Sequence, residues 1–341
     1  GTSYSQKIVL SGVTDSVTID NNKFFGYQGS NSSNHVSIYG NGADAAGLKI
    51  KNNTFTDGGN YAIYLNSSNS SSSPTGLEIS SNTFTDTYGG IYAEYFNAPT
   101  IQDNTIKGSY MTNHGIYLAY CDVANIPGNT IKGSGAYSGA GISLNYCDGA
   151  NVIENNQINA PDMTYGIYLN YCQATSGNEA TIVNNLINAG DYGIYLYNNN
   201  KYYNIYYNSV KVLNNNALYY YINPQNIILK NNIFYSASSS SPALYVNNTT
   251  GFTGAYNDLY SEYTYPIYFD GNKTFAEYQA TGHGANSVNL DPVYDTDPDN
   301  FMVPMRLLLD NLGTPIASIL DDMYGNTRSE TTPDMGAMEF T

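Results

Sequence analysis

Three carboxylates recur near matching positions of a repeated sequence and could do chemistry. Asp122 and Asp148 each follow a Tyr-Cys pair and lie 26 residues apart. If one repeat forms one turn of a stacked structure, the two side chains lie ~5 Å apart, at the spacing of neighbouring strands. Carboxylates at this separation can act as acid and nucleophile in glycoside cleavage, or bind Ca²⁺. With Glu94 expected one repeat earlier on the same edge, the candidate catalytic residues are Glu94, Asp122 and Asp148, although all three can equally be solvated loop residues.

Tyrosines form a second recurring set, in the segment Tyr165-Gly166-Ile167-Tyr168-Leu169 and its copies along the chain. Side chains alternate between the two faces of a strand, so Ile167 and Leu169 are expected in a core while Gly166, Tyr168 and Asn170 face outward. Aromatic faces can pair with the apolar faces of sugar rings, which favours a glycan ligand. The predicted ligand-binding residues are Tyr64, Tyr92, Tyr117, Tyr168, Tyr195, Tyr219, Asn145 and Asn170.

Small residues stand two positions before these tyrosines and are expected to form the floor of a shallow groove beside them. Ser143 interrupts the tyrosine column, and a ligand is expected to approach the backbone more closely there. The alternative is that stacked tyrosines only stabilise neighbouring strands. The expected floor residues are Ala62, Gly90, Gly115, Gly141, Gly166, Gly193, Ala217 and Ala243.

A further repeat, apolar-x-apolar-x-Asn-Asn-x-apolar, predicts the architecture that positions these residues. Each period of 22 to 31 residues holds three short alternating stretches, each suited to a strand of ~3 to 5 residues. This pattern predicts an all-β, single-stranded, right-handed parallel β-helix with three strands per coil and about ten coils. Identical corners stack, so the asparagines are expected to form a hydrogen-bonded ladder. Its members are Asn22, Asn53, Asn82, Asn104, Asn129, Asn156, Asn185, Asn208 and Asn232.

The repeat stops near residue 272, which divides the chain into two parts. Residues 1–271 are predicted to form the β-helix, and residues 272–341 a C-terminal capping segment that covers the open strand edge of the last coils. The repeats resemble the pectin-lyase-like β-helix superfamily. Arg328 and the ending Pro333-Asp334-Met335-Gly336-Ala337-Met338-Glu339-Phe340 resemble the C-terminal segment of surface-anchored bacterial β-helix proteins. The resemblance implies the fold and a secreted or cell-surface location, but no one activity.

Charge and composition narrow the possible partners. The chain has 12 basic and 28 acidic residues and a net charge of -16, which disfavours nucleic acid and anionic membrane surfaces. No apolar run approaches the ~18 residues of a membrane span. We therefore expect a monomeric extracellular domain that recognises a polysaccharide or oligosaccharide. A polysaccharide-degrading lyase or glycoside hydrolase and a structural surface spacer are the alternatives.

Three cysteines recur 26 and 25 residues apart, at Cys121, Cys147 and Cys172. No histidine joins their column, so they are expected to be small buried side chains rather than zinc ligands. No metal site and no cofactor is therefore predicted, with Ca²⁺ at the carboxylates as the one possibility.

Overall fold

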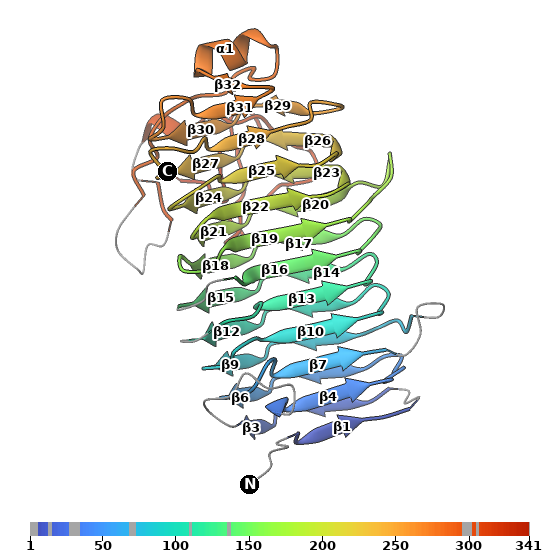
Figure 1. The fold of residues 1–341 in the computed structure, drawn as a ribbon. Helices are drawn as coiled ribbons and strands as arrows, with labels where there is room; N and C mark the ends of the chain where they lie inside the picture. The colour runs from blue at the N-terminus through green and yellow to red at the C-terminus, as the bar shows by residue number, and fades with distance from the viewer. Residues whose placement is uncertain are drawn as a thin grey trace.

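The computed structural model describes residues 6–12, 16–26, 35–67, 73–108, 111–134, 138–294, 302–304 and 307–340. Each repeat forms one coil, and each coil gives one strand to each of three sheets, named A, B and C here (Figure 1). Every pairing between successive coils is parallel, with the corresponding residues of the repeats aligned. The predicted all-β parallel β-helix with three strands per coil is confirmed.

Sheet A carries the Tyr-containing segments. Its strands, in spatial order, are β1 (Ile8–Leu10), β4 (Ile38–Asn41), β7 (Ile63–Asn66), β10 (Ile91–Glu94), β13 (Ile116–Ala119), β16 (Ala140–Asn145), β19 (Tyr165–Asn170), β22 (Tyr192–Tyr197), β25 (Leu218–Tyr221), β28 (Leu244–Val246), β31 (Ile267–Phe269) and β32 (Asn272–Lys273).

Sheets B and C flank the asparagine corner. Sheet B consists of β2 (Thr18–Asp20), β5 (Lys49–Lys51), β8 (Glu78–Ser80), β11 (Thr100–Gln102), β14 (Asn125–Pro127), β17 (Val152–Glu154), β20 (Ala180–Val183), β23 (Lys201–Tyr206), β26 (Gln225–Lys230) and β29 (Thr253–Ala255). Sheet C consists of β3 (Lys23–Phe25), β6 (Thr54–Thr56), β9 (Thr83–Thr85), β12 (Thr105–Gly108), β15 (Thr130–Gly133), β18 (Gln157–Ala160), β21 (Leu186–Ala189), β24 (Ser209–Val212), β27 (Ile233–Ser236) and β30 (Asp258–Ser261).

The predicted asparagine ladder is also confirmed, and it fixes the register of the coils. The side chain of Asn156 donates to the carbonyl of Ile126 (2.8 Å) and to Oδ1 of Asn185 (3.0 Å). Its own Oδ1 accepts from the backbone N–H of Asn129 (2.9 Å). The preceding residue, Asn155, has a left-handed φ of 54°, which turns the chain sharply at this corner. The ladder continues to Asn257, whose backbone N–H donates to the hydroxyl of Ser287 (3.1 Å).

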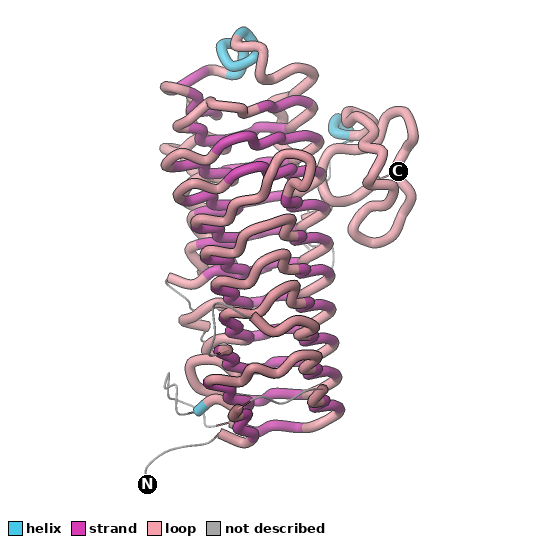
Figure 2. Tube along the Cα trace, turned by 90° about the vertical axis from the view of Figure 1, so that its right-hand side faces the viewer, coloured by secondary structure: helices cyan, strands magenta, loops and turns pink. Residues whose placement is uncertain are grey.

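The C-terminal segment consists of two parts that pack at different places on the coils. β32 pairs antiparallel with β31, and α1 (Phe275–Ala280) follows it over the last coil (Figure 1). Residues 307–340 lie along one flank of the stack and begin with the short 3-10 helix η3 (Leu307–Leu309) (Figure 2). There Met335 and Met338 form a second apolar cluster with Leu186 and Ile233 of sheet C. No helix of the described residues is both long and apolar enough to cross a membrane.

Candidate functional site

The outer face of sheet A gathers the six predicted tyrosines into one row. Tyr64 pairs with Tyr92 and Tyr92 with Tyr117, because their strands align residue by residue. Ser143 takes the next position, and the row resumes at Tyr168. It continues through Tyr195, Tyr219, Tyr245 and Tyr268. Tyr39 begins the row one coil before Tyr64.

The rings of this row stack face to face along the axis of the coils. Ring centroids of successive members are 4.2 to 5.6 Å apart, and their planes differ by 5° to 25°. A ring with a stacked tyrosine on each side has both faces covered, so a sugar ring cannot stack on it. Tyr117 and Tyr168, on either side of Ser143, each have a stacked tyrosine of this row on one side alone. Ring edges and hydroxyl groups are left to contact a ligand. Burial raises the pKa of Tyr168 and Tyr195 well above the usual value, so their hydroxyls stay protonated.

The expected groove floor of small residues is wrong. Gly141 is buried, and a Cβ on it would lie 2.6 Å from Cγ2 of Ile158 and 2.8 Å from the carbonyl oxygen of Gly166. A Cβ on Gly115 would lie 2.9 Å from Cγ2 of Ile131 in β15. Gly141 and Ile142 are adjacent and both buried, so the residue before the first isoleucine also points inward. The residues of this column are small because they pack against core side chains. The same holds for Ala62, Gly90, Gly166, Gly193, Ala217 and Ala243, all buried.

Ser143 does not open the backbone to a ligand either. Its side chain is 1% exposed, and its Oγ has no hydrogen-bond partner within the described residues. The gap in the tyrosine row is thus closed at its base. A surface ligand would meet the residues around this serine and not the serine itself.

A row of amides runs beside the tyrosines at the end of the strands. Nδ2 of Asn198 donates to Oδ1 of Asn170 (3.0 Å), and Nδ2 of Asn170 donates to Oδ1 of Asn145 (2.6 Å). Nδ2 of Asn145 lies 3.4 Å from the hydroxyl of Tyr117. The predicted ligand-binding residues Asn145 and Asn170 are therefore brought together with Tyr117. The amides and phenols present alternating hydrogen-bond donors and acceptors along the outer surface.

The three candidate carboxylates do not share one edge as expected. Glu94 aligns with Ala119 inside sheet A and accepts from the hydroxyl of Tyr92 (2.6 Å). Asp122 and Asp148 lie at the next corner, in successive coils. Oδ1 of Asp122 accepts a hydrogen bond from the backbone N–H of Asp148 (2.8 Å). Oδ1 of Asp148 in turn accepts one from the backbone N–H of Gln173 in the next coil (2.8 Å). The structure thus pairs Asp122 with Asp148 and places Glu94 in a different column. Burial and the charge of Asp122 raise the pKa of Asp148.

Other members of this surface were missed from the sequence. Tyr165 and Tyr192 stack with centroids 5.6 Å apart and tilt onto the main row. Tyr197 and Tyr221 extend the amide row with aromatic side chains. A separate stack, Tyr95, Tyr120, Tyr146 and Tyr171, follows the adjoining corner. The signal was present, because these residues recur with the same period as the main row.

His114 occupies the position of Tyr165 two coils earlier, and its Nδ1 accepts the backbone N–H of Ala140 (3.0 Å). Burial lowers the pKa of His114 from 6.5 to about 4. The folded state thus favours neutral imidazole, so this contribution to stability is present above pH 6.5 and is lost as the pH falls towards 4. Between pH 7 and pH 4, we expect the wild type to lose up to about 3 kcal/mol more unfolding free energy than His114→Gln, measured by urea denaturation. Equal losses in both proteins would contradict this role.

The three cysteines are free and buried, as expected for small core side chains. The backbone N–H groups of Cys121 and Cys147 each point at the sulfur of the next cysteine, at 3.4 Å. In the described ranges, no group of three or more His, Cys, Asp or Glu side chains is arranged to hold a metal ion. The cysteine column is therefore part of the packing between coils.

Comparison with known families agrees with this geometry. The model of the right handed beta helix region matches residues 4–144, 34–210 and 114–281, which together cover well over half of the chain. A comparison with curated proteins gave no significant match. The match fits the pectin-lyase-like superfamily that the repeats resemble. The chain therefore belongs to the right-handed parallel β-helix family.

Proposed function

We propose that this protein is an extracellular glycan-binding domain and that the ligand lies along the outer face of sheet A. The observation that carries the proposal is the row of phenol groups, interrupted once at Ser143, with the Asn145 and Asn170 amides beside it. Phenols and amides both donate and accept hydrogen bonds, which suits the hydroxyl groups of a sugar. A row that repeats with every coil suits a polymer. The net charge of -16 favours a neutral or weakly charged glycan as the ligand.

The stacking geometry makes the phenol hydroxyls the expected contacts. The double variant Tyr168→Phe and Tyr195→Phe keeps both rings in the stack and removes both hydroxyls. We expect it to weaken glycan binding by about tenfold or more, as lost hydrogen bonds do at a specific site. Retention by a panel of immobilised neutral polysaccharides, measured by affinity electrophoresis, checks this.

The matched control lies on another face. Tyr235 and Tyr260 form a tilted pair on sheet C, with centroids 5.7 Å apart. Tyr235→Phe with Tyr260→Phe removes the same atoms away from sheet A and should leave retention unchanged. If both double variants retain full affinity, the glycan does not depend on the sheet A hydroxyls and the proposal fails. If no polysaccharide is retained at all, the proposal also fails and a structural spacer is favoured.

A second candidate function is polysaccharide cleavage at Asp122 and Asp148. The position of these carboxylates in successive coils and the raised pKa of Asp148 favour it. In glycosidases one carboxyl group has a raised pKa and acts as the general acid, while a second carboxylate stays ionised. The same panel can be assayed for reducing and unsaturated ends. Product that disappears in Asp148→Asn would support the enzyme, whereas retention without product would leave a binding domain.

A further inference from the structure

A polar cleft of about 650 Å³ lies between the outer face of sheet B and the C-terminal segment. Strands β14, β17, β20 and β23 form its floor, and residues 318–322 form its wall. The floor belongs to the part of the chain that the family model matches, whereas the wall lies beyond residue 281, the last one matched. The cleft is therefore made by the way this tail docks on the coils.

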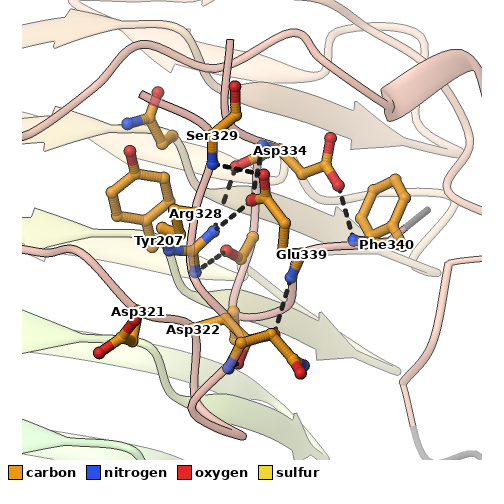
Figure 3. Close-up of polar contacts among 12 residues, drawn as sticks. Tyr207, Asp321, Asp322, Arg328, Ser329, Asp334, Glu339 and Phe340 are labelled. Atoms are coloured by element: carbon orange, nitrogen blue, oxygen red, sulfur yellow. Dashed lines mark hydrogen bonds and ion pairs between the residues drawn. The ribbon is translucent and has the colours of Figure 1, made fainter. Parts of the chain in front are cut away.

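The wall is fixed to the coils by a buried network. Nδ2 of Asn184 donates to the carbonyl oxygen of Asp321 (3.0 Å), and Oδ1 of Asn184 accepts from Nη2 of Arg328 (2.9 Å). The guanidinium of Arg328 lies 3.9 Å from the ring centroid of Tyr207. Asp322 accepts two backbone N–H groups of its own turn (2.8 and 2.9 Å), whereas Asp321 points away from the Arg328 cluster (Figure 3). These contacts within the protein hold the wall of the cleft in place, which lowers the entropy lost on binding.

The floor and wall carry hydrogen-bonding groups that the protein does not use. The Glu154 carboxylate makes no hydrogen bond or ion pair with another described residue, and burial raises its pKa. The Oδ1 atoms of Asn155 and Asn204 are buried with no hydrogen-bond partner in the part of the chain that the structure describes. Tyr206 adds a hydroxyl whose pKa burial raises to about 12. Most of these oxygens accept hydrogen bonds, so the complementary ligand is rich in donors.

The remaining lining narrows the ligand further. No Lys, Arg or His is among the described residues that line the cleft, and Glu154 and Asp321 disfavour anions. Ile319 and Leu320 give the wall an apolar part that can contact the C–H face of a sugar. The volume lies within the ~300 to 1,000 Å³ of ordinary ligand sites. We infer that this cleft binds a short neutral saccharide, at a second site distinct from the outer face of sheet A.

The test uses the full chain and four neutral tetrasaccharides, built of glucose, mannose, galactose and xylose. Saturation-transfer NMR detects binding, and calorimetry gives the affinity. We expect at least one of them to bind, and Glu154→Gln to weaken binding about tenfold because it removes a charged acceptor at nearly constant volume. Thr181→Trp, which places a large ring over the floor, is expected to abolish binding.

Two controls separate this cleft from the rest of the molecule. Glu78→Gln changes the same residue type on sheet B outside the cleft and should leave affinity unchanged. Tyr168→Phe with Tyr195→Phe alters sheet A, so the binding that belongs to the cleft is the part that this double variant keeps and that Thr181→Trp removes. The inference is overturned if no tetrasaccharide binds, if Glu154→Gln and Thr181→Trp both bind normally with native circular dichroism, or if only the sheet A variant loses binding.

Discussion

Replacing Asn156 by alanine is expected to lower the free energy of unfolding by about 3 to 5 kcal/mol. The Asn156 side chain donates to one backbone carbonyl in the previous coil, to one in its own coil and to the amide oxygen of Asn185. It also accepts from both the backbone and the side chain of Asn129. Alanine replaces none of these bonds and leaves a buried N–H and a buried carbonyl without partners. Each such group costs about 1 to 3 kcal/mol.

Guanidinium chloride unfolding of the variant and wild type measures this loss. The matched control is Asn159→Ala in the same coil, because Asn159 faces outward and accepts one bond from Asn188 (3.0 Å). The control is expected to cost less than about 1 kcal/mol. Equal losses for the two substitutions would show that the ladder adds nothing beyond an ordinary surface hydrogen bond.

Replacing Arg328 by alanine is expected to release the C-terminal segment from the coils. Arg328 is 4% exposed, pairs with Glu339 at 3.3 Å and donates to Asn184 and to the carbonyl of Gly336 (Figure 3). Removing one partner of a buried ion pair costs about 3 to 5 kcal/mol, since the other charge is left buried and unpaired. Hydrogen exchange should therefore accelerate in residues 313–340 while the coils far from the tail keep their protection.

An exposed ion pair provides the comparison. Lys49 contacts Glu78 at 3.2 Å, and both side chains reach solvent. Lys49→Ala is expected to cost less than about 1 kcal/mol and to leave exchange in the tail unchanged. Arg328→Lys should fall between the two, because an ammonium keeps the charge but cannot reproduce the planar guanidinium. Unchanged exchange in the tail of Arg328→Ala would contradict this account of its docking.

Sequence periodicity was enough to predict the coils, the asparagine ladder and the row of tyrosines. Each depends on one residue type returning once per coil, and parallel stacking converts that return into contact. The inward position of Gly141 and its column could not be predicted, because the alternation of buried and outward residues fails where Gly141 and Ile142 are adjacent and both buried. The covered ring faces could not be predicted either, since side-chain rotamers decide whether tyrosines stack or spread.

The sheet B cleft could not be predicted from the sequence, for a different reason. Asn184 and Asp321 are 137 residues apart, and no period relates the tail to the coils. The motif that contains Asp334 and Glu339 resembles the C-terminal segment of a family of β-helix proteins, but this resemblance does not indicate which sheet of the β-helix the segment packs against. Contacts made between a repetitive part and a non-repetitive part leave no regular trace in the sequence.

The asparagine ladder is directional, and this constrains how the molecule can change in length. Every rung donates its backbone N–H to the amide oxygen of the following coil, until Asn257 donates to Ser287. A whole coil inserted or deleted between two rungs preserves every donor and acceptor, whereas a fraction of a coil moves the following asparagine out of line with its partner. The two ends of the ladder are not equivalent. At the C-terminal end the hydroxyl of Ser287, and not an asparagine amide, accepts the last backbone hydrogen bond. Such a β-helix can therefore lengthen in evolution by duplication of complete coils between its two ends.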